Sequence, residues 1–451
     1  MRKPSKATWA ASVLASVVGM ALMSIAPEAA APAGALATVP CAAPIPPATW
    51  STRQIGSTGA DAAAGLAVDA SRCAVYVAGR AGAAVSPATS AGGTDVVLAR
   101  YETTGAQRWL VQFGSPGFEW VGGVTVDAAG DVYVVGWTDD ILPGSPVINF
   151  GGFDTFLLKF DPDGVLMWTR QLGGTSNDYA LGVAASANGD VYVTGYTDGV
   201  LIGASAGGRD YFLARYDASG NLLMLTQRGS AADDYGTAVA AGPAGNAYVA
   251  GETFGDLAGV SAGGRDLFVA KYDDAGAELW LDQRGTSAQE LAGGIAVNST
   301  NDVFVVGSTS GALDGNVNQG FADMVLLRYD ANGTWRFTRQ RGSTDNDDAH
   351  GVAIGAGGGP YVVGTTSGAL DGNVNAAGTA DVFVMKFGKG GAWNWTRELG
   401  GNSADSGTGI AVMGNDNVFA AGGFNNTFPG LTSLGSSDIL ALRYDGTGAL
   451  R

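Results

Sequence analysis

This chain of 451 residues combines a net charge of −17 at pH 7 with 15% charged and 46% hydrophobic residues. Its acidity argues against a nucleic-acid partner, because phosphate backbones demand a basic face. Its single histidine leaves no histidine cluster for a zinc, copper or iron centre. The 72 glycines suit many tight turns between closely packed sheets.

The start of the chain has the pattern of a secretory signal peptide. Three basic residues within the first six precede an apolar run from Ala10 to Ala26, which is short for a membrane-spanning helix. We expect a signal peptide over residues 1–37, cleaved at a point within residues 26–37. The mature protein is then exported to the extracellular space, the cell surface or the periplasm, with no transmembrane span.

A linker is expected to follow the signal peptide. Residues 38–49 are rich in Ala and Pro, and residues 50–451 are expected to form the folded domain. The two cysteines are Cys41 in the linker and Cys73 in the domain. In an oxidising compartment they can form a disulfide; the alternative is two unrelated thiols. We expect the disulfide, because both cysteines survive processing and lie close in sequence.

From Trp50 onward the chain consists of seven copies of one unit, of which residues 168–223 are a clear example. Each copy reads as four short strands separated by turn residues, and the intervals between copies are 59, 59, 56, 56, 57 and 58 residues. A period of this size built only of strands predicts an all-β fold, a seven-bladed propeller of four-stranded antiparallel blades. The copies open at Trp50, Trp109, Trp168, Met224, Trp280, Phe337 and Trp395.

Within the unit that opens at Trp168, the predicted strands are A (Gly182–Ser186), B (Val191–Thr197) and C (Asp210–Asp217). Strand D is formed by the opening residues of the next copy. The last copy ends after strand C, and its missing strand D is available as Trp50–Ile55. We therefore expect the N-terminal strand to complete the last blade and close the ring, which protects the sheet edges.

The segments GDVYVTGYT, GGRDYFLARYD and WTRQLGG resemble the bacterial SBBP-type β-propeller repeat of exported and cell-surface proteins. The resemblance extends over the seven copies. It implies a seven-bladed propeller at the cell surface. The family has little assigned chemistry, so the resemblance implies architecture and location more than activity.

Two acidic columns recur in every copy. One precedes strand A: Asp61, Glu119, Asp178, Asp234, Glu290, Asp347 and Asp405. The other opens strand C: Asp95, Asp154, Asp210, Asp266, Asp323, Asp381 and Asp438. A catalytic group is needed once, whereas a group that maintains the fold is needed in every blade. We interpret both columns as structural acceptors of loop N–H groups or partners of a base; the alternative is a ring of carboxylates that binds cations.

Two loops before strand C carry alternating Asp and Asn oxygen donors with a glycine turn, a pattern similar to calcium loops. The late glycine and the absence of a bidentate Glu weaken it, and Asp and Asn also form simple Asx turns. Calcium is therefore a possible cofactor rather than an expected one. The candidate donors are Asp314, Asn316, Asn318 and Asp323 in one loop, and Asp371, Asn373, Asn375 and Asp381 in the other.

Cationic residues interrupt the repeat on one sector. Because D-to-A and B-to-C loops emerge on the same face of a propeller, we expect these residues to gather there and to bind an anionic or glycan ligand. The alternative is pairing with nearby acids such as Asp233, Asp234, Glu290 and Asp347. For the histidine, the alternative is a hydrogen-bonded position at the rim. The candidates are Arg209, Arg228, Arg265, Arg284, Arg341 and His350.

These patterns favour an exported, non-catalytic binding or adhesion module at the cell surface, a monomer whose ligand sits on the D–A/B–C loop face. The ligand class stays open between a glycan, a peptide and a protein. One alternative is a secreted hydrolase or lyase that uses loop-face carboxylates, although no nucleophile elbow or phosphate-binding loop is present in the sequence. Another is a structural protein of the envelope or matrix.

Overall fold

The computed structural model describes Trp50 and residues 52–146, 151–259, 261–375, 379–414 and 416–451. The predicted signal peptide, the linker and Cys41 lie outside these residues. Cys73 is disulfide-bonded, while its pairing with Cys41 stays a prediction. No helix in the described ranges is long and apolar enough to cross a membrane.

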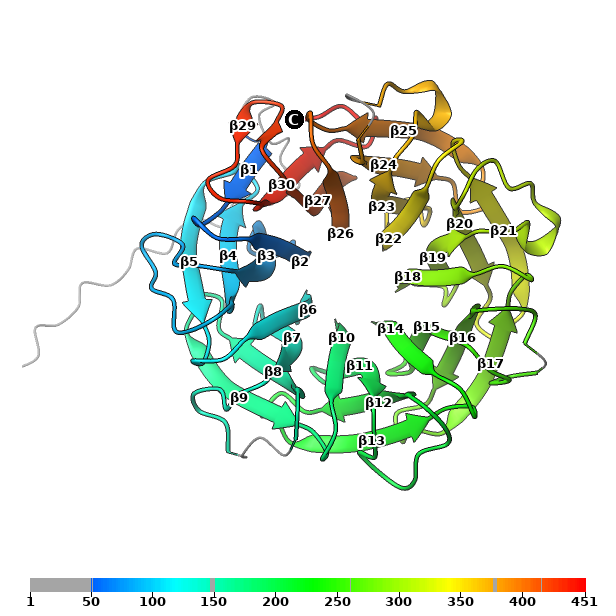
Figure 1. Ribbon diagram of the computed structural model, residues 1–451, viewed down its shortest axis with the longest axis horizontal. Helices are drawn as coiled ribbons and strands as arrows, with labels where there is room; N and C mark the ends of the chain where they lie inside the picture. Colours follow the sequence, from blue (N-terminus) through cyan, green and yellow to red (C-terminus); the bar gives the residue numbers. More distant parts are fainter. Residues whose placement is uncertain (1–49, 51, 147–150, 260, 376–378, 415) are drawn as a thin grey trace, which may run out of the picture. The chain divides into compact units, whose positions relative to one another are not determined.

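The strands of the described residues form seven four-stranded antiparallel sheets, arranged as blades around a ring (Figure 1). Blade 1 contains β2 (Asp61–Asp69), β3 (Ala74–Ala81), β4 (Asp95–Glu102) and β5 (Gln107–Phe113). Blade 2 contains β6 (Glu119–Val126), β7 (Val132–Thr138), β8 (Asp154–Phe160) and β9 (Leu166–Leu172). Blade 3 contains β10 (Asp178–Ala185), β11 (Val191–Thr197), β12 (Asp210–Tyr216) and β13 (Leu222–Arg228).

The remaining blades follow the same order. Blade 4 contains β14 (Asp234–Ala241), β15 (Ala247–Thr253), β16 (Asp266–Tyr272) and β17 (Glu278–Arg284). Blade 5 contains β18 (Glu290–Val297), β19 (Val303–Thr309), η1 (Leu313–Gly315), β20 (Asp323–Tyr329) and β21 (Trp335–Arg341). Blade 6 contains β22 (Asp347–Ile354), β23 (Pro360–Thr366), η2 (Leu370–Gly372), β24 (Asp381–Phe387) and β25 (Trp393–Leu399). Blade 7 contains β26 (Asp405–Met413), β27 (Asn417–Phe424), β30 (Asp438–Tyr444) and β1 (Thr52–Ile55), with a small ribbon of β28 (Thr427–Phe428) and β29 (Leu431–Thr432) beside it.

In each blade, strand A lies nearest the centre of the ring, and strands B, C and D follow in order towards the rim (Figure 1). Strands B and C are buried on both faces, because each blade packs against its two neighbours. This explains why they read as almost continuous apolar runs rather than as alternating ones. One such layer joins Tyr133 and Leu157 of blade 2 to Val193 and Phe212 of blade 3.

The predicted closure of the ring is confirmed. β1 pairs antiparallel with β30, with Ile55 opposite Ile439, and so supplies strand D of blade 7. Trp50 is fully buried, with its ring 5.5 Å from that of Tyr101 in blade 1 and 5.3 Å from that of Phe419 in blade 7. Its aromatic surface therefore fills the junction between the first and last blades.

The predicted bounds of strand B were correct, whereas strand A begins four residues earlier than expected. In blade 3 it starts at Asp178, and the pairing register shifts between Ala180 and Gly182. This β-bulge lets the strand continue to the acidic residue that was expected to lie in the preceding loop. The two acidic columns are therefore the first residues of strands A and C.

Candidate functional site

The acidic columns lie at the loop-side ends of the strands and are almost entirely buried. Glu119, which opens strand A, accepts the backbone N–H of Ser115 at 3.0 Å and the hydroxyl of Thr138 at 2.8 Å. Asp95, which opens strand C, accepts the backbone N–H of Ala91 at 3.0 Å and the side-chain amide of Gln112 at 2.7 Å. Each of these two carboxylates thus accepts a hydrogen bond from the loop that precedes it, and the structural role of the columns stays a prediction.

Burial changes the protonation of the strand-A column. Removal from water raises the pKa of Asp178 and of Asp405 to about 6, because the hydrogen bonds from the loop only partly offset the loss of solvation. The same cause raises the pKa of Asp61, Glu119, Asp234 and Asp347. The strand-C aspartate of the preceding blade raises these values further, since the two carboxylates repel one another.

A third column was not predicted. A glutamine on strand D donates its amide N–H to the strand-C aspartate and accepts a backbone N–H of the B–C loop, as Gln227 does with Asp210 at 2.8 Å and Leu201 at 2.8 Å. The glutamines that donate to a strand-C aspartate are Gln54, Gln112, Gln227, Gln283 and Gln340. Blade 6 departs from them with Glu398, whose pKa burial raises to about 7.

The two predicted calcium loops form turns in which the first aspartate accepts hydrogen bonds from within the protein. Asp314 accepts from Arg284 at 2.8 Å and from the hydroxyl of Thr338, and it adopts a left-handed conformation with φ of 51°. The amides of Asn316 and Asn318 donate to backbone carbonyls at 2.8 and 2.9 Å. In the described ranges, no three His, Cys, Asp or Glu side chains converge as a metal-binding group. Calcium binding stays a prediction.

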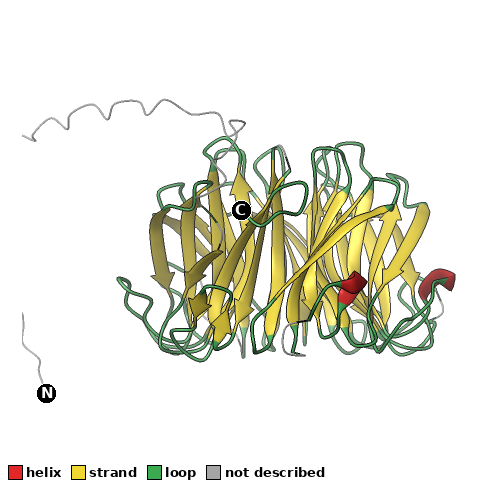
Figure 2. Cartoon of the chain, turned by 90° about the horizontal axis from the view of Figure 1, so that it is seen from above, coloured by secondary structure: helices red, strands yellow, loops and turns green. Residues whose placement is uncertain are grey.

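The second loop repeats this arrangement. Asp371 accepts from Arg341 and from the hydroxyl of Thr396. The amides of Asn373 and Asn375 donate to backbone carbonyls at 2.8 and 2.7 Å. The helical turns η1 and η2, which contain the two aspartates, lie on the same face of the ring (Figure 2).

The five predicted ligand-binding arginines divide into two groups. Arg228, Arg284 and Arg341 end strands D at the rim, whereas Arg209 and Arg265 precede strands C and reach the inner strands. All five form ion pairs, although with different acids from those expected: Asp198 with Arg209, Glu278 with Arg228, Glu252 with Arg265, Asp282 and Asp314 with Arg284, and Asp371 with Arg341.

His350 lies apart from both groups of arginines, on the innermost strand β22. Its Nδ1 is 2.7 Å from the backbone carbonyl oxygen of Gly407 in blade 7. The geometry fits a hydrogen-bonded histidine that links two blades. A role of His350 in ligand binding stays a prediction.

A continuous row of aromatic rings, which we call the aromatic strip, crosses blades 2 to 4. Adjacent ring centroids lie 6.1, 5.5, 4.7, 4.8 and 6.2 Å apart, with stacked and edge-to-face contacts alternating along the row up to the last pair. These are preferred geometries for aromatic pairs. The members in order are Trp120, Trp137, Tyr179, Tyr196, Tyr235 and Phe254.

The register of the blades positions this strip. The second residue of strand A lies opposite the penultimate residue of strand B, as Tyr179 lies opposite Tyr196 and Trp120 opposite Trp137. Both positions are at the D–A/B–C end of the strands. The equivalent pairs of blades 5, 6 and 7 carry no aromatic residue: Leu291 with Ser308, Asp348 with Thr365, and Ser406 with Gly423. The strip therefore breaks the sevenfold repeat.

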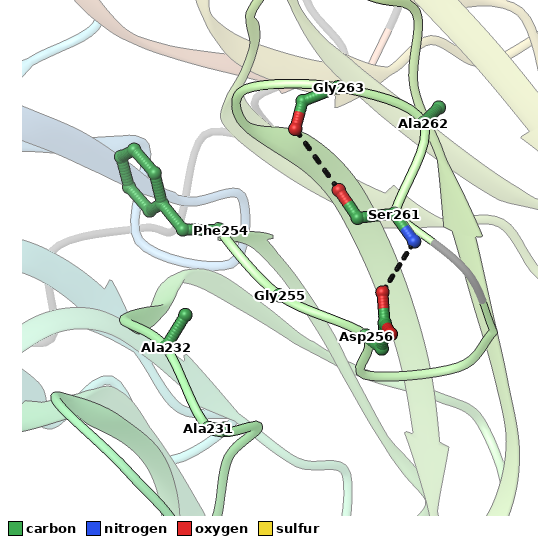
Figure 3. A pocket seen from close by; sticks show the side chains of 8 residues that line it. All are labelled: Ala231, Ala232, Phe254, Gly255, Asp256, Ser261, Ala262 and Gly263. Carbon is green, nitrogen blue, oxygen red and sulfur yellow. Dashed lines mark hydrogen bonds between the residues drawn. The ribbon is translucent and has the colours of Figure 1, made fainter.

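The strip is only half-buried, and it ends at an open pocket of about 570 Å³. Phe254, which is 39% exposed, forms one wall, and the D–A loop at Ala232 and the B–C loop at Asp256 and Ser261 to Gly263 form the others (Figure 3). Asp256 fixes that loop by accepting the backbone N–H of Ser261 at 2.7 Å.

Arginines lie over the strip. The guanidinium of Arg209 is 5.4 Å from the ring of Tyr196 and donates to the hydroxyl of Tyr235 at 2.6 Å. That of Arg265 is 4.6 Å from the ring of Phe254. Burial raises the pKa of Tyr196 to about 12, so its hydroxyl remains protonated at neutral pH. The strip therefore offers flat apolar rings, hydroxyl groups and guanidinium donors, and no phenolate base from Tyr196.

The aromatic strip was missed because the repeats were compared for what they share. The signal was present in the sequence: Trp137 and Tyr196 follow the invariant glycine of strand B, where other copies have small or charged residues. Aligning the copies and reading strand A against strand B would have brought the aromatic residues together.

Comparison with known proteins agrees with the fold. A curated relative, the regulatory protein FlaEY of Caulobacter vibrioides, is 28% identical over 372 residues, which is 72% of this chain and 38% of that protein. The chain thus spans well under half the length of this relative. Among solved structures, an ulvan lyase described as a new family of polysaccharide lyase is 11% identical, with a TM-score of 0.50, over 88% of this chain and 97% of the lyase. At this identity the likeness concerns the fold alone.

The repeat itself is recognised directly. Residues 168–202 match the model of the SBBP family, described as a beta-propeller repeat. This range covers the end of strand D of blade 2 and strands A and B of blade 3, which include Tyr179 and Tyr196. The chain is therefore a seven-bladed β-propeller that carries the SBBP repeat.

Proposed function

We propose that this protein is a glycan-binding module that takes its ligand along the aromatic strip of the D–A/B–C face. The observation that carries the proposal is the restriction of six contacting rings to blades 2 to 4 of a fold that otherwise repeats seven times. Rings needed only to hold blades together are expected in every blade.

Glycans suit this surface for physical reasons. The less polar face of a sugar packs against a flat ring, and its hydroxyl groups bond to polar groups at the edge. Tyrosine and tryptophan provide large rigid contact area at low conformational cost. The extended row favours a chain of sugars over a single one, with the pocket beside Phe254 receiving one end.

We further propose that the module acts outside the cytoplasm, as an adhesion or recognition element. This rests on the signal-peptide pattern of the first 37 residues and on the resemblance to repeats of exported proteins. Fractionation of cells that produce the full chain, followed by detection with an antibody to the propeller, tests the location. Recovery only from the cytoplasm contradicts it.

Binding is tested on an array of neutral and acidic polysaccharides, with release of reducing ends measured in parallel. The Tyr196→Leu variant, which removes a central ring, is expected to bind roughly tenfold more weakly, since central aromatic residues dominate such interfaces. The control is Trp393→Leu, which removes an exposed ring of the outer strand β25.

Equal loss in both variants, or no binding to any polysaccharide, contradicts the proposed function. Turnover of a bound polysaccharide replaces it with an enzymatic one. Melting temperatures of the variants show whether a loss of binding reflects a loss of folding.

A further inference from the structure

One arginine differs from all those identified in the sequence as candidates. Arg80 is the penultimate residue of β3 and pairs across the sheet with Ala62. In blades 2 and 3 the equivalent positions hold Trp137 and Tyr196, two members of the aromatic strip. Arg80 therefore continues the strip into blade 1.

The guanidinium of Arg80 covers the first ring of the strip. Its Cζ lies 3.3 Å from the ring centroid of Trp120, which in turn stacks on Trp137. In the described part of the chain, no carboxylate lies within ion-pair distance of Arg80 and no hydrogen bond is formed by its side chain. Arg209 and Arg265, by contrast, pair with Asp198 at 2.7 Å and Glu252 at 2.9 Å.

This arrangement is unusual on electrostatic grounds. The protein carries a net charge of −17, so acids are plentiful, yet Arg80 is half-buried without one. Burial lowers the pKa of Arg80, and no neighbouring acid offsets that effect. The face of an indole attracts the cation but satisfies none of its five N–H donors. A planar guanidinium with free donors, held over the face of a ring, is preorganised for a carboxylate or sulfate.

We propose that the glycan is anionic and that Arg80 binds its carboxylate or sulfate groups at the blade 1 end of the aromatic strip. The proposal rests on the proposed function and adds the chemical class of the ligand. Arg209 and Arg265 lie further along the same surface, where their charges are already balanced and their N–H groups serve sugar hydroxyls. A chain of acidic sugars then places one anionic group on Arg80 and packs its rings on the aromatic residues that follow.

The test uses the full chain and matched pairs of polymers: polygalacturonate and its fully methyl-esterified form, and dextran sulfate and dextran. The wild-type protein is expected to bind a charged polymer at least tenfold more tightly than its neutral counterpart, with affinity that falls as salt is added. The first pair reports carboxylate recognition and the second reports sulfate recognition.

Three variants locate the charge effect. Arg80→Met, which keeps much of the apolar stem, is expected to lose roughly tenfold in affinity for the charged polymer and little for the neutral one. Arg336→Met removes an exposed, ion-paired arginine of β21 and is expected to change neither. Arg80→Lys retains the charge but not the planar fork, so an intermediate affinity is expected.

The outcomes separate the two proposals. Equal binding of charged and neutral polymers, or an unchanged affinity of Arg80→Met for the charged ones, overturns the anionic ligand and leaves the glycan-binding function standing. Failure of every polymer to bind overturns both. If the melting curve of Arg80→Met indicates that this variant does not fold, the proposal is decided by the charge preference of the wild type and by the affinity of Arg80→Lys.

Discussion

At the scale of single residues, the exceptions to the repeat are more informative than its columns. Glu398 stands where the structure elsewhere places a glutamine whose amide donates to the strand-C aspartate. Its Oε2 accepts the backbone N–H of Leu370 at 3.1 Å, and its Oε1 is buried without a hydrogen bond in the described structure. Burial, with repulsion from Asp381 and Asp347, raises its pKa to about 7. The ionised form of Glu398 therefore destabilises blade 6.

Replacing Glu398 tests whether its ionisation destabilises the protein. Because the folded-state pKa of Glu398 lies above the unfolded value, its cost to stability grows as pH rises through the interval from about 4.5 to about 7. Glu398→Gln is expected to raise the free energy of unfolding by about 1 kcal/mol at pH 8 and by little at pH 5. Urea unfolding at the two pH values measures both.

The matched control is the reverse change in the neighbouring blade. Gln340, which donates to Asp323 at 2.9 Å, becomes an acid in Gln340→Glu, and this variant is expected to lose stability at pH 8. A stabilisation by Glu398→Gln that is the same at both pH values contradicts the role given to ionisation.

At the scale of elements, the start of strand C and the loop from strand D to the next strand A fit together through glycine. A β-carbon added to Gly229 would lie 2.0 Å from Oδ1 of Asp210, so the loop can approach the buried carboxylate only without a side chain. The same contact recurs at Gly285 with Asp266 and at Gly342 with Asp323. This packing explains why a glycine follows strand D in every copy.

Gly229→Ala is therefore expected to destabilise the protein by about 1–3 kcal/mol, a range typical of overpacking in a tight site. The added methyl group displaces Asp210 from the amides of Ala206 and Gln227. Gly357→Ala, in an exposed turn with open space around its Cα, is the control and is expected to change little. Chemical denaturation of both variants measures the difference; similar values for the two count against the packing argument.

The elements also show how much of the fold could be predicted from the sequence. The repeat predicted the blade number, the ring closure and the bounds of strand B, because the same pattern occurs in all seven copies of the sequence. The start of strand A was placed too late, because the bulge beside Gly182 hides the alternation of that strand. Partners such as Arg284 and Asp314 are 30 residues apart and meet only through the docking of one blade on the next, so spacing could not reveal them.

The candidate site was harder to predict than the fold for the same reason. Arg80 lies against Trp120, and Trp137 against Tyr179, only after neighbouring blades pack. Each of these pairs joins two copies of the repeat. A comparison of copies position by position shows that a residue is unusual, and the three-dimensional register is needed to show what it touches.

At the scale of the whole molecule, the buried carboxylates make stability depend on pH. Between about pH 4 and pH 6 the folded protein binds more protons than the unfolded chain, because burial raises the pKa of Asp178 and Asp405 to about 6. Stability contributed by these groups therefore falls as pH rises through this window. Below it the sign reverses, since hydrogen bonds and ion pairs lower the pKa of Asp302 and Asp416, and their contribution is lost as they protonate.

The propeller is accordingly expected to be most stable near pH 4–5, with a higher melting temperature at pH 5 than at pH 8. Differential scanning calorimetry across pH 3 to 8 gives the whole profile. A melting temperature that rises steadily from pH 5 to pH 8 contradicts the assignment of raised pKa values to the strand-A column.

The pairing of β1 with β30 also imposes a delay on folding during synthesis, because the two strands are far apart in the sequence. Thr52 to Ile55 leave the ribosome among the earliest residues of the propeller, and their partners from Ile439 to Leu442 leave it among the last. At about 5–20 residues per second, the first strand waits roughly 20–80 s for its partner. Throughout that interval the growing chain presents an unpaired strand at one end and an uncovered blade at the other. The ring therefore closes only after its last strand has been synthesised.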